Sequence, residues 1–111
     1  MDNSLKESLD HANKMKVFNN QLRLLKEKYL ERNIHFTVGH QFTIDLHLIN
    51  YCITLKNQNK IKDVIMLDDY DLPVRIDDLE SFYDNIMDLY QQNLNAYIVE
   101  YNKLVQDKGR I

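Results

Sequence analysis

The sequence has little glycine, proline or cysteine and no tryptophan: 2 Gly, 1 Pro and 1 Cys among 111 residues. With so few turn-forming residues, the backbone is expected to form long regular elements joined by short connections. The single cysteine, Cys52, excludes an internal disulfide bond. The chain has no run of about 18 apolar residues, so no membrane-spanning helix is expected. Residues 1–14 lack an apolar segment, so no secretory signal is expected either.

What the chain does contain is ordinary for a globular protein, with 44% hydrophobic and 28% charged residues, and its length predicts one domain, 1–111. The net charge of −3 is unevenly spread. Residues 1–60 carry nine Lys and Arg against six Asp and Glu, whereas residues 61–111 carry five against eleven. This distribution lacks the basic surface that nucleic-acid binding needs. It favours attraction between the two parts, within one chain or between neighbouring chains.

The stretch 77–107 predicts a long C-terminal helix. It contains no Gly or Pro, and Asp77 with Glu80 forms the expected capping pair at its start. At about 1.5 Å per residue such a helix is about 45 Å long, so it is expected to cross the domain and to reach beyond it. Apolar residues recur along it three and four apart, as on one face of an amphipathic helix: Leu79, Tyr83, Ile86, Tyr90, Leu94, Tyr97, Tyr101 and Leu104.

Residues 1–33 form the expected leading segment, with a helix that starts near residue 3. Its apolar residues are spaced 3, 4, 3 and 4 apart, a coiled-coil-like seam made of Met15, Phe18, Leu22, Leu25 and Tyr29. Basic residues dominate the charge of this helix, and they face either solvent or the acidic C-terminal region. The first dozen residues offer only Leu5, Leu9 and Ala12 for burial, so this part either frays or is ordered by a partner.

A first hairpin and a helix are expected next. Apolar and polar residues alternate around Gly39-His40, which predicts strands at 34–38 and 41–44 joined by a tight turn. Asp45 follows as the expected N-cap of a helix that begins at residue 46 and ends near residue 57.

A second hairpin completes the segment 34–76. Its strands are expected at 64–67 and 72–76, with Pro73 at a sheet edge or at the start of its strand. Both hairpins lead into an Asp-capped helix. This shared hairpin–helix pattern arose either by internal duplication or independently, from the same local physics. The elements predict an α+β fold in which a long N-terminal helix, a middle helix and a long C-terminal helix accompany two β-hairpins. The hairpins are expected to form a small antiparallel sheet covered on one face by the helices.

The acidic stretch after residue 68 shows part of a calcium-binding pattern. Asp69, Asp71, Asp77 and Glu80 stand at positions 1, 3, 9 and 12 of an EF-hand loop. Position 6 needs a Gly for the sharp turn and is Val74 here. We therefore expect a solvated turn and a helix cap instead of a calcium site.

A second incomplete metal pattern consists of three histidines near the cysteine. His35, His40, His47 and Cys52 are separated by five, seven and five residues. Zinc ligands usually come as close pairs that converge on one point, and these spacings do not converge. The pattern also supplies no third residue to orient a Cys-His catalytic pair. No metal, cofactor or catalytic residue is expected, and the chain is predicted not to be an enzyme.

Tyrosines mark the last helix, where Tyr83, Tyr90 and Tyr97 recur every seven residues on one face. They form either the inside of the domain or a protein–protein seam, because tyrosine combines a large apolar area with a polar tip. Acidic neighbours argue against stacking on nucleotides. The predicted protein interface combines these residues with the seam of the first helix: Tyr83, Tyr90, Tyr97, Tyr101, Phe18, Leu22, Leu25 and Tyr29.

Two runs carry a resemblance to known proteins, NQLRLLKEKYLERNIHFTVGHQFTIDLHLINYCITL and VIMLDDYDLPVRIDDLESFYDNIMDLYQQNLNAYIVEYNKL. They resemble small proteins of tailed bacteriophages, in particular of contractile-tailed phages that infect marine cyanobacteria. The shared features are a leading helix, a Gly-turn hairpin ending in an Asp-capped helix, an acidic hairpin with one proline, and a Tyr-rich last helix. The resemblance covers about residues 11–107, and its motifs are structural.

The resemblance implies a non-catalytic structural or virion-associated protein that acts through contacts of its long helices. Its expected partners are further copies of itself in a homo-oligomer, other phage structural proteins, or both, with no membrane and no direct contact with nucleic acid. Its expected location is the virion or the host cytoplasm. The alternative is an early phage protein that binds and inhibits a host protein.

Overall fold

The computed structural model describes residues 3–109, and their side chains as far as Asp107. It contains three helices and two hairpins in the order α1 (Asn3–Arg32), β1 (Ile34–Thr37), β2 (His40–Thr43), α2 (Leu46–Asn57), β3 (Lys62–Leu67), β4 (Pro73–Asp78) and α3 (Leu79–Gly109). The predicted α+β class is confirmed.

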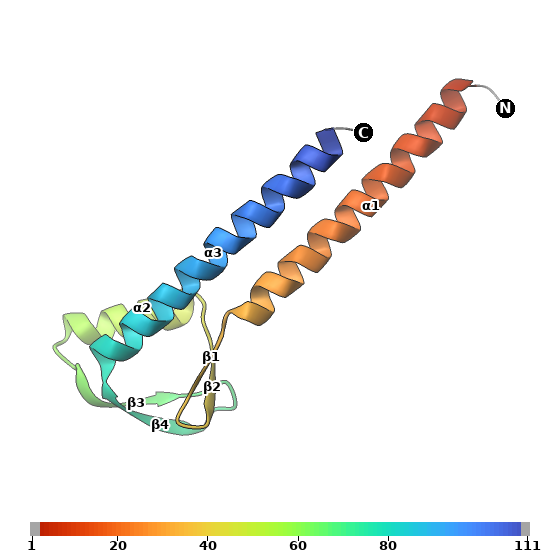
Figure 1. The fold of residues 1–111 in the computed structure, drawn as a ribbon. Coiled ribbons are helices and arrows are strands. Elements are labelled where there is room, and N and C mark those ends of the chain that lie inside the picture. Colours follow the sequence, from red (N-terminus) through yellow and green to blue (C-terminus); the bar gives the residue numbers. More distant parts are fainter. Residues whose placement is uncertain (1–2, 110–111) are drawn as a thin grey trace.

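The described part of the chain is elongated, with extents of 70 × 24 × 21 Å. Its radius of gyration is 20.7 Å, against about 13 Å for a compact chain of this length. In Figure 1, α1 and α3 lie side by side and antiparallel, and the other elements gather at one end. This end is named the head, and the α1–α3 pair is named the helical hairpin. The long last helix therefore does reach beyond the domain body, as the sequence predicts.

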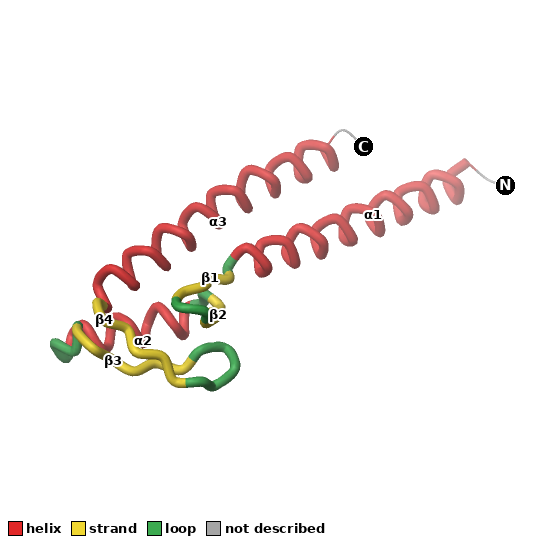
Figure 2. Tube along the Cα trace, turned by 60° about the horizontal axis from the view of Figure 1, so that its bottom comes forward, coloured by secondary structure: helices red, strands yellow, loops and turns green. Residues whose placement is uncertain are grey.

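The strands form two separate two-stranded antiparallel sheets, β1-β2 and β3-β4, where a single sheet was expected. Figure 2 shows the two strand pairs apart from each other in the head, with β1-β2 next to the end of α1 and β3-β4 below α2. No backbone ladder joins them. The hairpins are joined instead by one backbone hydrogen bond, from the Asp69 N–H of the β3–β4 turn to the Gln41 carbonyl at 2.9 Å, and by side chains of that turn.

The core lies in the head and is built around the first turns of α3. Leu79 and Ile86 are 0% exposed, as is Cys52 on α2. The ring of Phe82 meets the ring of Phe42 edge to face, with centroids 5.3 Å apart. One end of α3 is thus packed inside the head, while its remaining length lies outside and pairs with α1.

The helix caps follow the sequence prediction at α2 and depart from it at α3. Asp45 accepts a hydrogen bond from the backbone N–H of Leu48 at 2.9 Å, so its predicted role is confirmed. The cap of α3 is Asp78 and not Asp77, because Asp78 accepts from the N–H groups of the next turn at 3.1 and 3.3 Å. The Leu79 N–H donates to the Ile61 carbonyl at 2.9 Å. This bond holds the chain extended for one residue longer than the sequence predicts.

The first hairpin turns one residue earlier than expected. Its central residues are Val38 and Gly39, with φ of 51° and 78°, and Thr37 pairs with His40 across the ladder. Positive φ at both positions is the geometry of a type I′ turn, and for β-branched Val38 it is strained. The expected Gly39-His40 turn is therefore wrong. As a consequence His40 belongs to β2, where its side chain reaches the second hairpin.

Candidate functional site

The outer part of α3 is the candidate functional region, and its face toward α1 contains both apolar and polar contacts. Residues spaced three and four apart contact α1 in order along the helix. The ring of Tyr97 meets that of Tyr29 with centroids 4.6 Å apart. Further out, Leu104 and Leu25 line the same surface hollow. The seam between α1 and α3 is therefore apolar near its outer end, and polar contacts lie between that end and the tyrosine pair.

Glu100 links the two helices electrostatically. Its Oε1 accepts from Lys28 Nζ at 3.0 Å and from an Arg32 guanidinium nitrogen at 3.3 Å. The hydrogen bond from Lys28, followed by that from Arg32, lowers the pKa of the Glu100 carboxyl against the opposing effect of burial. The basic residues near the C-terminal end of α1 therefore do contact the acidic C-terminal region, one of the two alternatives that the sequence left open.

A buried amide joins the helical hairpin to the head. The Asn93 side-chain nitrogen donates to the Arg32 carbonyl and to Asn33 Oδ1, both at 2.8 Å. Asn33, 2% exposed, also accepts at its carbonyl from the Ile44 N–H at 2.7 Å. Asn93 thus holds the point at which α1 ends, the first hairpin begins and α3 leaves the head.

A second apolar row runs along α3, beside the seam. It is named the α3 stripe and consists of Tyr83, Met87, Tyr90, Leu94, Ile98, Tyr101 and Val105, spaced four and three apart. Its first half is covered by the head, where three of its residues pack against the core. Its outer half emerges, since Ile98 is 51% exposed and Tyr101 and Val105 are 40% and 41% exposed.

The exposed surface around the outer half of the α3 stripe has few charges. Between Asp88 and Asp107 only Glu100 and Lys103 are charged, in a chain that is 28% charged overall. Successive residues are about 100° apart around the helix axis. Ile98 therefore lies on one side of Tyr97, and Glu100 and Lys103 lie on the opposite side. Apart from Val99, the exposed uncharged side chains outside the stripe are neutral amides. Depletion of charge is typical of the centre of a protein interface.

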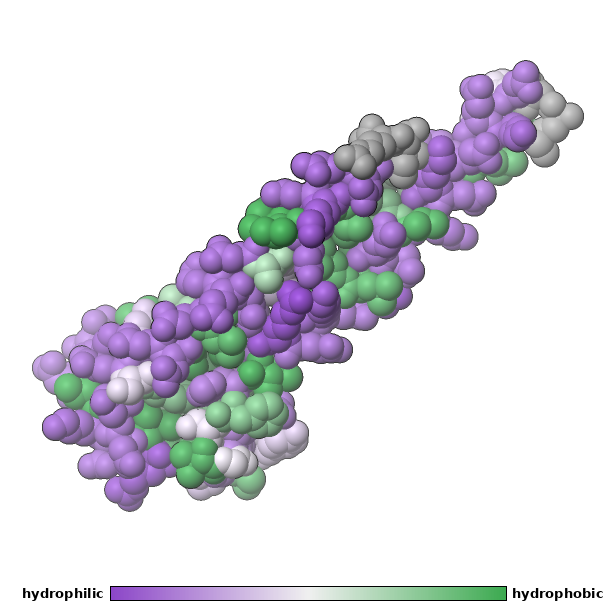
Figure 3. All heavy atoms as spheres, viewed as in Figure 1, coloured by the Kyte–Doolittle hydropathy of each residue, from purple (hydrophilic) through white to green (hydrophobic). Residues whose placement is uncertain are grey.

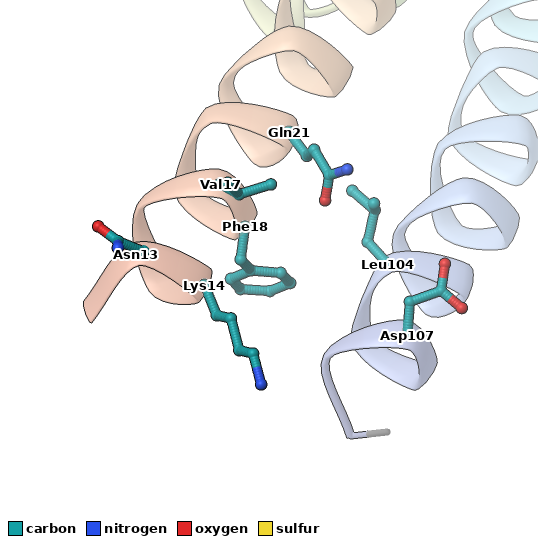
Figure 4. A pocket seen from close by; sticks show the side chains of 7 residues that line it. All are labelled: Asn13, Lys14, Val17, Phe18, Gln21, Leu104 and Asp107. Atoms are coloured by element: carbon teal, nitrogen blue, oxygen red, sulfur yellow. The ribbon is translucent and has the colours of Figure 1, made fainter. Parts of the chain in front are cut away.

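On the other side of the helical hairpin an open groove runs between α1 and α3. Two hollows of about 230 and 330 Å³ share Gln21 and Leu104. Figure 4 shows Phe18 and Gln21 projecting from α1 toward Leu104 on α3. In Figure 3 apolar residues likewise appear along the paired helices as well as on the head. The helical hairpin thus offers apolar surface on two sides.

In the head, the acidic turn fastens the two hairpins together. Asp69 accepts from the Thr43 N–H at 2.8 Å and from the Thr43 hydroxyl at 2.7 Å. Asp68, only 6% exposed, lies with Oδ2 at 2.7 Å from His40 Nδ1. The same carboxylate accepts backbone N–H bonds from its own turn at 2.8 and 2.9 Å. Sequence reasoning missed this role because the contacts join residues 26 to 28 positions apart.

These contacts predict an acid-sensitive head. The hydrogen bond with His40 is the largest cause that lowers the pKa of Asp68, helped by the two backbone N–H bonds and opposed by burial. The carboxylate therefore stabilises the fold above its unfolded pKa of about 3.9. This contribution is lost as the pH falls through the lower folded-state pKa.

Replacing His40 with alanine should lower the free energy of unfolding at neutral pH. It should also flatten the loss of stability between about pH 5 and about pH 2, because Asp68 then titrates closer to its unfolded pKa. Urea unfolding at each pH measures both effects. His47→Ala serves as the control, since that side chain is exposed on α2. The same acid dependence in wild type and His40→Ala would contradict the role given to the pair.

The structure separates the other metal candidates. Within residues 3–109 no three His, Cys, Asp or Glu side chains lie where they could hold one metal ion. His40 pairs with Asp68, His47 is exposed, and Cys52 is buried in the core. Burial raises the pKa of the Cys52 thiol to about 11, with Lys56 opposing the shift. In the described part of the chain no helix is both long and apolar enough to cross a bilayer.

The predicted interface residues are largely used between elements of the same chain. Leu25 is buried, and Phe18, Leu22 and Tyr29 are half-buried along the face of α1 toward α3. Burial and the neighbouring Tyr29 side chain raise the pKa of the Tyr90 hydroxyl, and the Lys56 ammonium lies 4.3 Å from the Tyr83 ring centroid. Tyr101 is the most exposed of the predicted set on α3. Sequence reasoning omitted Ile98 and Val105, although their spacing from Tyr101 was available.

Comparison of the chain with models of protein families, with curated proteins and with solved structures gives no match.

Proposed function

We propose that this protein is a non-catalytic assembly protein that docks through its helical hairpin and belongs to the virion of a tailed bacteriophage. The observation that carries the proposal is the uncovered outer half of the α3 stripe. Ile98, Tyr101 and Val105 continue a row that the head has buried, yet 40% to 51% of each residue is exposed. A contiguous apolar row of this kind is typical of a surface that another protein covers.

The polar groups of the chain support a structural role. Asp68 and Asp69 connect the hairpins, Glu100 connects the long helices, and Asn93 connects the helices to the head. Each is thus occupied in holding elements together. The Cys52 thiol, with its raised pKa and buried position, has the opposite properties to a reactive nucleophile.

The virion setting is supported by the resemblance to small proteins of contractile-tailed phages. The elongated shape fits it as well, since the head provides a folded base and the helical hairpin extends from it toward a neighbour (Figure 1). Such an arrangement separates the part that folds from the part that docks.

Mass spectrometry of purified particles from the phage that encodes the chain tests the proposal. The chain should be present in intact particles, and Ile98→Lys should reduce its incorporation relative to Val99→Lys. If the chain is abundant in infected cells but absent from particles, the virion role is wrong. Copurification with one host protein would then favour the inhibitor alternative.

A further inference from the structure

The covered half of the α3 stripe shows what kind of element fits the open half. α2 runs antiparallel to α3 along the stripe. Its last turns are at Tyr83, where Lys56 lies 4.3 Å from the ring centroid. Its first turn lies toward the middle of α3 (Figure 1), where Leu48 and Tyr90 both pack against the core of the head. Burial, the Tyr29 side chain and the charge of Asp45 raise the pKa of the Tyr90 hydroxyl, in agreement with this position. The cover is therefore an antiparallel helix, and it ends where α2 begins.

The open half of the stripe is complementary to itself. Leu94, Ile98, Tyr101 and Val105 are spaced 4, 3 and 4 apart, an order that reads the same in both directions. If a second α3 packs antiparallel about a two-fold axis, Leu94 faces Val105 and Ile98 faces Tyr101. Each apolar residue then meets an apolar residue, as an isologous interface requires.

Charge permits this pairing, although α3 is acidic as a whole. The acidic residues Glu80, Asp84 and Asp88 lie on the first turns of α3, and the next acidic residue on this helix is Glu100. Glu100 is already paired with two basic side chains of α1. Two copies of the segment 89–106 therefore meet without opposing like charges, which an acidic helix packed along its full length could not do.

The lengths of the elements also agree with this pairing. With Ile98 opposite Tyr101, residue 109 of one copy is level with residue 90 of the other. Gly109 is the last residue of α3, and Tyr90 is the outermost residue of the stripe that packs against the core of the head. The second α3 thus begins to cover the stripe where α2 stops, and neither helix has to displace the other. In Figure 1 the outer part of α3 has α1 beside it and no part of α2.

We propose that a second copy of this chain covers the open half of the α3 stripe in an antiparallel, two-fold symmetric dimer. This inference rests on the proposed docking role of the helical hairpin and names its first partner. The two α1 helices lie on the same side of the α3 pair, so the four long helices form a bundle with a head at each end. The first turns of α1 extend past the end of α3 and run alongside the head of the other copy, which gives the exposed Leu5 and Leu9 a surface to contact.

Light scattering on the purified full chain tests the dimer. At micromolar concentration the mass should be twice the chain mass of 13.3 kDa. Ile98→Lys should weaken dimerisation roughly 30-fold or more, as for a residue at the centre of an interface. Val99→Lys is the matched control, because Val99 is adjacent and 53% exposed against 51% but faces about 100° away. Circular dichroism of both variants separates loss of the dimer from loss of the fold.

A mixing experiment tests the orientation. Ile98→Glu and Tyr101→Lys should each be monomeric alone. When they are mixed, position 98 of one variant faces position 101 of the other, so oppositely charged groups meet and the heterodimer should form. In a parallel pairing position 98 faces position 98, and the mixture would stay monomeric. A monomeric mixture would therefore overturn the antiparallel arrangement.

The outcomes separate this inference from the proposed function. A wild-type chain that stays monomeric at all concentrations, or a dimer that survives Ile98→Lys, overturns the inference. In either case the presence of the chain in particles would still support the docking role with a different partner. A chain that dimerises through the stripe but is absent from particles supports the inference and overturns the virion proposal.

Discussion

Replacing Ile86 with alanine is expected to lower the free energy of unfolding by about 2–5 kcal/mol, the range for truncating a buried isoleucine. Ile86 is 0% exposed and lies where α3 passes through the head, so the cavity would open at the centre of the only large core among the described residues. Total stability of a domain this size is about 5–15 kcal/mol. The change therefore removes a large part of it. Urea unfolding followed by circular dichroism measures the loss.

The matched control for Ile86→Ala is Val99→Ala on the same helix. Val99 is 53% exposed and lies outside the α3 stripe, so its truncation should change the free energy of unfolding by about 0.5 kcal/mol or less. Similar losses for the two variants would mean that the head is not the stable part of the molecule, and the separation of head and helical hairpin would have to be abandoned.

Replacing Asn93 with leucine is expected to cost about 1–3 kcal/mol for each buried acceptor left without its donor. Asn93 donates to the Arg32 carbonyl and to Asn33 Oδ1, and Asn33 is 2% exposed, so water does not readily replace the lost bonds. The helical hairpin should loosen first, because this amide holds its base. Thermal unfolding and hydrogen exchange of α1 amides measure the effect.

Two further variants make the Asn93 test specific. Asn95→Leu changes the same residue type two positions along, on the exposed face, and should be nearly neutral. The double variant Asn33→Leu with Asn93→Leu should recover part of the loss, since removing both partners leaves fewer unpaired groups than removing one. If Asn95→Leu is as destabilising as Asn93→Leu, the buried hydrogen bonds are not the cause.

Local patterns in the sequence predicted the elements well, and tertiary pairing decided what they missed. The spacing of apolar residues and the Asp45 cap give the bounds of α2 as the structure has them. At the start of α3 two aspartates stand side by side, and local propensity cannot choose between them. The hydrogen bond from Leu79 to the Ile61 carbonyl makes the choice, and it joins residues in different elements.

The first turn and the sheet show the same limit. A positive φ is unfavourable for a β-branched residue, so local propensity predicted a turn that begins after Val38. In the structure Thr37 pairs with His40 across the ladder, and this pairing places Val38 in the turn at positive φ. Nothing within either hairpin says whether the two share a sheet. The contacts of Asp68 and Asp69 that join them come from a turn, and only one of them is a bond between backbone groups, from the Asp69 N–H to the Gln41 carbonyl.

The proposed docking site was only partly predictable for a related reason. The seven-residue repeat of Tyr83, Tyr90 and Tyr97 identifies α3 as the helix of interest. It does not tell which faces of α3 are covered by α1 and α2. Only the structure shows that the ring of Tyr97 packs against Tyr29, whereas Ile98, the next residue, is exposed.

The pairing of α1 with α3 has a consequence for synthesis of the chain. Arg32 and Glu100 are 68 residues apart, and ribosomes add about 5–20 residues per second. The residues of α1 that pack on α3 are therefore synthesised roughly 3 to 14 s before their partner residues on α3. During that time Leu25 and Tyr29 are open to chaperones and to other nascent chains. The head cannot form earlier either, because its core contains the first turns of α3. Folding of the head therefore requires synthesis of the chain at least as far as Ile86, and pairing of the helical hairpin requires synthesis of the outer part of α3.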